Sequence, residues 1–130
     1  MRAVDTNLVV RLFTQDDAEQ VGAARRALAA DTVFVPKSVI IEFEWVMRGV
    51  YEASRASIAS ALQTILDTAN VEVEDAATVA RAVDWFRHGM DLADAVHLAS
   101  SAHADCFVTF DRTLRRRATK LQAKPVVIEP

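Results

Sequence analysis

Four acidic residues stand out because each lies in or next to a segment predicted to be a strand or a helix. They are Asp5, Glu42, Asp94 and Asp111, and they are so widely spaced that only folding could bring them together. Carboxylates held close together repel one another, so a site that they share implies divalent cations, and Mg²⁺ and Mn²⁺ prefer oxygen ligands. The chemistry expected of such a site is phosphodiester hydrolysis.

Ordinary structural roles could also account for several of these acids. Asp5 and Asp111 stand where they could cap helices, and Asp91 and Asp94 could be a cap and a first-turn acid favoured by the helix dipole. Each acid therefore has two interpretations. The metal interpretation depends on all four carboxylates being brought to one place.

The glutamates Glu42 and Glu44 share one predicted helix but are expected to differ in role. The apolar stripe of this helix is expected to consist of Val39, Phe43, Val46 and Val50. Glu42 borders that stripe, so we expect it to be partly buried. Glu44 lies on the other side and has Arg48 four residues later, a spacing that suits a surface ion pair.

Asp94 shares a helical face with His97, Leu98 and Ser101, so its carboxylate is expected to point at the sheet and not into solvent. Burial without a counter-charge raises the pKa of a carboxyl group, whereas a bound divalent ion lowers it. A metal ion is therefore the simplest way to balance the four acids. We interpret His97 as a packing or hydrogen-bonding residue, with a supporting role beside the metal as the alternative.

The composition indicates one globular domain over residues 1–130, because 52% apolar residues can form a substantial core. Trp45, Trp85 and the phenylalanines occur at core-like spacing and are interpreted as packing, not as surfaces that stack bases. The single cysteine excludes disulfide frameworks and cysteine zinc sites. The chain shows no leader pattern and no apolar run long enough for a membrane span, so we expect a cytoplasmic protein.

Positive charge is concentrated near the end of the chain, although the formal net charge is −3. Residues 111–124 include six basic residues and one acid. A solvated helix face would explain such a run. The alternative is that Arg112, Arg115, Arg116 and Arg117 hold the phosphates of a nucleic acid.

The order of the predicted elements indicates an α/β protein. The expected strands are residues 2–5, 32–35, 71–74, 106–110 and 125–128. The expected helices are residues 8–13 after a Thr6 or Asn7 cap, 18–30, 39–50 after a Ser38 cap, 54–68, 76–88, 91–104 and 112–119. This alternation predicts a three-layer α/β/α fold with a central parallel sheet of four to five strands. Ligands of such sheets bind beyond the carboxyl ends of the strands, where Asp5 and Asp111 are expected.

Four segments, taken in order, resemble the PIN-domain family and, more narrowly, the VapC-type toxin ribonucleases of VapBC toxin–antitoxin modules. The segments are Val4–Asn7, Ile41–Arg48, Asp91–Ala99 and Thr109–Asp111. The resemblance spans nearly the whole chain. It implies a PIN-like fold in which a parallel sheet lies between helices.

The resemblance also implies roles for individual residues. The positions that match the family's catalytic, metal-binding acids are Asp5, Glu42, Asp94 and Asp111, and those that match its auxiliary residues are Asn7, Asp91 and Thr109. The implied cofactor is Mg²⁺, or Mn²⁺, as one or two ions. Water activated by the metal would then hydrolyse an RNA phosphodiester bond.

As the toxin of a toxin–antitoxin pair, such an endoribonuclease would be neutralised by a VapB-type antitoxin protein. The resemblance also implies a homodimer, with higher-order assembly when the antitoxin is bound. The RNA would be held by the arginines of residues 112–117.

Two other functions fit part of the pattern. A receiver-like regulatory module would bind Mg²⁺ without catalysis, but it needs an acidic pair near the first strand, where Asp5 stands alone. A structure-specific DNA nuclease of the same broad fold is the other alternative, and such chains are usually much longer. RNA hydrolysis is therefore the preferred hypothesis.

Overall fold

The structure is a computed structural model that describes all 130 residues, and it consists of two compact units. The first unit is Met1–Ala76 and the second is Ala77–Pro130. The single domain expected over residues 1–130 stays a prediction.

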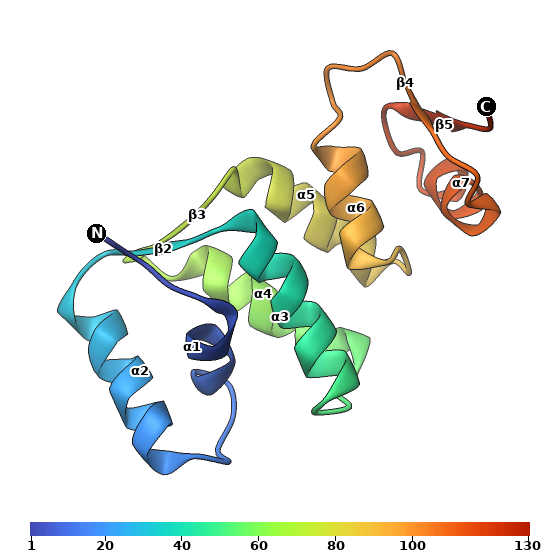
Figure 1. The fold of residues 1–130 in the computed structure, drawn as a ribbon. Helices are drawn as coiled ribbons and strands as arrows, with labels where there is room; N and C mark the ends of the chain where they lie inside the picture. The colour runs from blue at the N-terminus through green and yellow to red at the C-terminus, as the bar shows by residue number, and fades with distance from the viewer. The chain divides into compact units, whose positions relative to one another are not determined.

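The first unit contains a three-stranded parallel sheet with the strand order β1-β2-β3 (Figure 1). The strands are β1 (Arg2–Ala3), β2 (Val33–Val35) and β3 (Val71–Val73). Val33 pairs with Arg2 on one side and with Val71 on the other. β-Branched valines favour this extended backbone, and Val33, Val35 and Val73 are buried in the core.

The helices of the first unit are α1 (Thr6–Arg11), α2 (Ala18–Ala30), α3 (Lys37–Gly49) and α4 (Arg55–Asp67). Within this unit, α1 packs against α2 and α3, and α3 packs against α4 (Figure 1). The side chains of Asp5, Asp17 and Ser54 cap three of the four helices by accepting backbone hydrogen bonds.

The caps predicted at Thr6 or Asn7 and at Ser38 are wrong, whereas the interpretation of Asp5 as a helix cap is confirmed. Asp5 caps α1 in place of Thr6 or Asn7. Helix α3 begins after Pro36 without a side-chain cap from Ser38. The N–H of Lys37 donates instead to Oε1 of Glu74, at 2.8 Å. A residue 37 positions away therefore satisfies this helix end, and local sequence patterns do not reveal such a partner.

The second unit joins a two-stranded parallel sheet to three helices. The helices are α5 (Ala76–Arg87), α6 (Leu92–Ala99) and α7 (Arg112–Lys120), and the strands are β4 (Cys106–Val108) and β5 (Val126–Ile128). Cys106 pairs with Val126 and Val108 with Ile128, and α7 packs against β5 (Figure 1). No helix of the chain has the length and apolar character required to cross a membrane.

The α/β class and the parallel direction of the strands are confirmed, but the single central sheet of four to five strands is not. The five strands lie in one sheet of three and one sheet of two. Strand pairing depends on hydrogen bonds between distant segments, which local patterns do not specify. Helix α6 also ends at Ala99 and not at residue 104. There the N–H of Ser101 donates to the backbone oxygen of Leu98, three residues earlier, at 3.0 Å, so the last turn tightens and the α-helical pattern stops.

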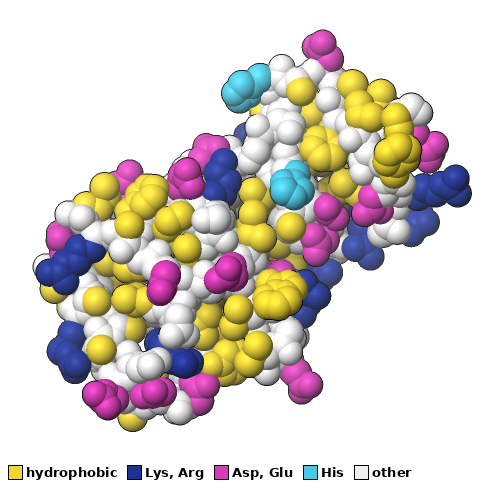
Figure 2. Space-filling view, in the orientation of Figure 1, with side chains coloured by type: hydrophobic (Ala, Val, Ile, Leu, Met, Phe, Trp, Pro, Cys, Tyr) yellow, Lys and Arg dark blue, Asp and Glu magenta, His cyan; other side chains and the backbone are white.

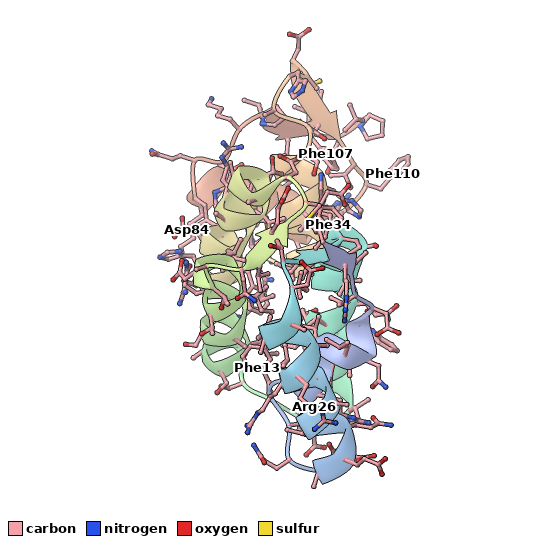
Figure 3. All side chains as sticks on the ribbon, turned by 90° about the vertical axis from the view of Figure 1, so that its left-hand side faces the viewer. Phe13, Arg26, Phe34, Asp84, Phe107 and Phe110 are labelled. Carbon is pink, nitrogen blue, oxygen red and sulfur yellow. The ribbon has the colours of Figure 1, made fainter.

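Aromatic side chains divide between the core and the surface. Phe43 is fully buried, and its ring meets that of Phe13 edge to face with centroids 5.5 Å apart. Trp85 is also buried, as expected. Trp45 is 64% exposed and Phe110 is 87% exposed, so the prediction that these two rings pack in the core is wrong. Figure 3 shows the ring of Phe110 standing clear of the ribbon.

Candidate metal-binding site

Asp5 is the N-cap of α1, and only one of its two carboxylate oxygens takes part in the cap. Its Oδ1 accepts a hydrogen bond from the N–H of Leu8 at 3.1 Å, which leaves Oδ2 for another partner. The side chain is exposed and follows directly after β1 and Val4. Asn7 is exposed in the first turn of the same helix. The sequence therefore places a fixed carboxylate just beyond the end of a strand, as predicted.

Glu42 and Glu44 exchange the environments expected from the sequence. Glu42 is exposed, whereas Glu44 is only 4% exposed. The buried side chains of α3 are Val39, Ile40, Phe43, Glu44 and Met47, while Val46 is half-buried and Val50 is exposed. The predicted stripe was thus rotated by about one residue, or roughly 100°. An exposed Glu42 is free to bind a ligand from solution.

The ion pair between Glu44 and Arg48 is confirmed, but its carboxylate is buried. Nε of Arg48 lies 2.8 Å from Oε1 of Glu44, and the guanidinium reaches solvent. We expect Arg48→Met to destabilise the protein by about 1–2 kcal/mol, because it leaves a buried carboxylate without its counter-charge. Urea unfolding measures the effect. The double variant Glu44→Gln/Arg48→Met should recover part of the loss.

The control for this variant is Arg81→Met, which removes an exposed arginine from α5. It should change the free energy of unfolding by no more than about 0.5 kcal/mol. If Arg48→Met changed the free energy of unfolding as little as this control, the ion pair with Arg48 would not be needed to stabilise the buried Glu44 carboxylate.

Three acids of the second unit are arranged by the ends of α6 and α7. Asp91 caps α6 by accepting a hydrogen bond from the N–H of Asp94, at 3.1 Å. Oδ1 of Asp111 caps α7 by accepting from the N–H of Leu114, at 3.0 Å, which leaves its Oδ2 available. The hydroxyl of Thr109 accepts from the N–H of Asp111, also at 3.0 Å, and so fixes the backbone that carries this acid.

Asp94 occupies an environment that disfavours its ionised form. Its side chain is half-buried on α6. Burial raises its pKa above the usual aspartate range, and the nearby carboxylates of Asp91 and Asp111 raise it further. His97 and Arg117 act in the opposite direction but do not compensate. The expected partial burial of Asp94 is thus confirmed, and a cation beside its carboxylate would be favourable.

We expect Asp94→Asn to stabilise the metal-free protein at neutral pH. A raised pKa in the folded state means that ionised Asp94 is destabilising, fully so above that pKa. The benefit of the substitution should disappear as the pH falls to the ordinary aspartate range, where Asp94 is protonated. Thermal unfolding in EDTA across this pH range measures it. A variant less stable than the parent at neutral pH would contradict the expectation.

The basic helix α7 is partly neutralised by its neighbours. Arg112 and Arg115 approach Oε1 of Glu129 at 3.6 and 3.3 Å. Arg117 donates to the backbone oxygen of Gly89, and Arg116 is exposed without an ion pair. Figure 2 shows Lys and Arg side chains gathered over α7. Of the four proposed RNA-binding arginines, Arg116 therefore carries the least compensated charge.

Sequence reasoning missed a polar network in the first unit. Arg11 donates from Nη1 to Oδ1 of Asp16, at 3.1 Å, and to the hydroxyl of Tyr51, at 2.9 Å. Its Nε donates to Oε1 of Gln20, at 2.6 Å. Arg11 and Tyr51 are 40 positions apart, so no local motif could have indicated their contact.

The donor chemistry of the candidate acids fits a divalent cation. Asp5 and Asp111 each keep one oxygen outside their helix-cap hydrogen bonds, Glu42 is exposed, and Asp94 lies among like charges. Oxygen ligands of this kind suit Mg²⁺ and Mn²⁺. The acids fall two in each unit, and neither unit by itself holds three acidic, histidine or cysteine side chains arranged to bind a metal ion.

The family model described as PIN domain matches residues 2–120. This match covers most of the chain and includes all four acids. The chain belongs to the PIN domain family. A comparison with curated proteins found no match. PIN domains are generally metal-dependent nucleases, so this PIN domain is assigned to nucleic-acid hydrolysis, which counts against the receiver-like alternative.

Proposed function

We propose that this PIN domain is a Mg²⁺-dependent endoribonuclease and the toxin of a VapBC-type toxin–antitoxin pair. The chain belongs to a family of nucleases, and one observation supports a metal site in it. Asp94 is half-buried near the carboxylates of Asp91 and Asp111, and both burial and the like charges raise its pKa. A bound cation would reverse that effect. Mn²⁺ is the alternative ion, and one or two ions would be bound.

Asp5, Glu42, Asp94 and Asp111 are the proposed ligands and catalytic acids. When bound, the metal would supply the Lewis acidity that activates a water and neutralises charge on the phosphodiester. The hydrogen bonds that cap α1 and α7 leave one carboxylate oxygen of Asp5 and one of Asp111 outside the cap, which supports this assignment. The other proposed residues have supporting roles. Thr109 orients the backbone of Asp111, and Asp91 caps α6. Asn7, which is exposed in the first turn of α1, would contact the substrate or the metal-bound water.

The proposed cellular context follows from the VapC-type resemblance in the sequence. The partners are a VapB-type antitoxin and a second copy of the chain in a homodimer, and the location is the cytoplasm. Co-expression with the antitoxin should relieve growth inhibition that the active protein causes and that an Asp5→Asn variant does not.

The activity is tested by incubating the purified protein with single-stranded RNA and with DNA of the same sequence. Cleavage of RNA should require Mg²⁺ or Mn²⁺, stop with EDTA, and leave a 5′-phosphate. DNA cut as fast as RNA would favour the DNA nuclease alternative. RNA cleavage that survives chelation would refute the mechanism.

The arginines of α7 are proposed to hold the RNA backbone, and Glu129 is expected to weaken that contact. We expect Arg116→Ala to lower RNA affinity and to reduce the slope of log K against log salt by about 0.7, the contribution of one phosphate on a single strand. Glu129→Gln should raise affinity, because it releases Arg112 and Arg115. Fluorescence anisotropy in EDTA at several salt concentrations measures both.

The control is Arg81→Ala on α5, which removes an exposed arginine outside the basic helix. It should leave the salt slope unchanged. If the Arg115/Arg116/Arg117 triple alanine variant bound RNA like the parent, α7 would be a solvated face and nothing more.

A further inference from the structure

An open pocket of about 380 Å³ lies in the first unit between α1 and α2, next to Asp5. The residues at and on α1 that line it include Asp5, Asn7 and Arg11, and those on α2 include Gln20 and the small side chains of Ala23 and Ala27. The volume is within the range of small-molecule sites, which is roughly 300–1,000 Å³. The pocket therefore has room for a ligand beside one of the candidate metal-binding acids.

Arg11 is held in a fixed position at this pocket and retains hydrogen-bonding capacity. Asp16, Tyr51 and Gln20 accept three of its N–H groups. A guanidinium has five such donors in a planar fork, so about two remain for a ligand. A side chain already fixed by neighbours loses little entropy on binding, and the fork suits phosphate oxygens.

The pairing of Arg11 with Asp16 does not prevent a phosphate contact. The Asp16 carboxylate is half-exposed and lies on the loop between α1 and α2, and it does not line the pocket. Six residues of helix rise about 9 Å, so Arg11 is well separated along α1 from Asp5. It would therefore contact a different part of an RNA strand from the phosphate at the metal.

We infer that this pocket binds one nucleotide of the RNA substrate, with Arg11 contacting its phosphate and the Ala23 and Ala27 wall accommodating its sugar or base. The inference rests on the proposed function. It identifies Arg11 as a substrate-binding residue that no family motif in the sequence had indicated. The exposed lining is mostly apolar, which suits a sugar or base, and the spare donors of Arg11 favour a nucleotide over a wholly apolar protein segment.

The test compares variants in binding of a short fluorescein-labelled single-stranded RNA, in EDTA, at several salt concentrations. Arg11→Met should weaken binding about tenfold, as expected for a lost charged contact, and reduce the salt slope by about 0.7. Ala23→Leu, which fills the pocket from α2, should weaken binding without changing the slope. The matched control Ala29→Leu, exposed on α2 outside the pocket, should bind like the parent.

Asp16→Asn separates substrate binding from a purely structural network. It removes the anion that competes for Arg11, so RNA should bind as tightly as in the parent or more tightly. If Asp16→Asn weakened binding as much as Arg11→Met, or if Arg11→Met left the salt slope unchanged, the inference would be overturned. Thermal unfolding of each variant shows whether a loss of RNA binding is caused by unfolding of the protein. Arg11→Lys keeps the positive charge, so compared with Arg11→Met it should restore part of the slope of log K against log salt.

Cleavage kinetics in Mg²⁺ distinguish failure of this inference from failure of the proposed function. Arg11→Met and Ala23→Leu should raise KM more than they lower kcat. If both variants matched the parent while Asp5→Asn was inactive, the nuclease would stand and the pocket would be left to another ligand, such as an antitoxin segment. If the parent itself cleaved no RNA, the proposed function would fail first.

Discussion

Replacing Asp5 with Asn is expected to lower Mg²⁺-dependent RNA cleavage by at least about 100-fold, because loss of residues that only support metal ligands already costs 10–100-fold. Asn caps helices as well as Asp does, so α1 should keep its start. The change removes the negative charge and one carboxylate oxygen while the hydrogen bond to the N–H of Leu8 can persist. Initial rates at saturating Mg²⁺, with circular dichroism as the check of folding, measure the effect.

Asp17→Asn is the matched control for this substitution. Asp17 caps α2 by accepting a hydrogen bond from the N–H of Gln20 at 3.0 Å, so it has the same structural role without the proposed metal role. Its variant should retain parental activity. Equal losses from Asp5→Asn and Asp17→Asn would mean that Asp5 acts through the fold of its helix and not through a metal.

Phe43→Ala is expected to destabilise the protein by about 3–5 kcal/mol, the usual cost of removing a buried aromatic side chain. Phe43 is fully buried, and its ring packs edge to face on Phe13, which follows α1. The contact joins the region of Asp5 to the helix that carries Glu42. Urea unfolding at neutral pH measures the loss, and the remaining folded protein should also show weakened cleavage.

Trp45→Ala, two positions along the same helix, is the control. Because Trp45 is 64% exposed, its truncation should change the free energy of unfolding by no more than about 0.5 kcal/mol. Sequence spacing placed both rings in the core and would therefore predict a large loss of stability for both variants. The burial seen in the structure predicts a large loss for Phe43→Ala alone. Similar losses for the two variants would contradict the burial described for α3.

The sequence predicted the order and type of the elements because those features depend on local patterns. Valine-rich segments became β2 and β3, and Asp91 and Asp111 cap their helices, as one of the two interpretations of these acids expected. The four acids could be nominated for the same reason, since three of them stand in or near turns that begin helices. The family match over residues 2–120 agrees with the resemblance on which their roles were based.

Features that depend on distant contacts could not be predicted. The amphipathic pattern of α3 allowed two neighbouring phases, and only packing against other helices shows that Glu44 is inside and Glu42 outside. The division of the strands into two sheets and the contact of Arg11 with Tyr51 likewise involve residues far apart in the chain. Such contacts leave no periodic signal in the sequence.

The basic helix illustrates a similar limit for charge. Counting residues 111–124 suggested a strongly positive segment, but Glu129 lies against Arg112 and Arg115. The acid that moderates the segment comes from the residue after β5 and was outside the counted window. Local charge density therefore overstated the charge available to a phosphate backbone.

Anomalous diffraction from crystals soaked in Mn²⁺ tests whether the four acids share one metal centre. Manganese should be bound by carboxylate oxygens of Asp5, Glu42, Asp94 and Asp111, and the signal should be lost in crystals of Asp94→Asn. Manganese bound only elsewhere, or held by acids of one unit alone, would contradict the proposal that these four residues form one catalytic metal centre.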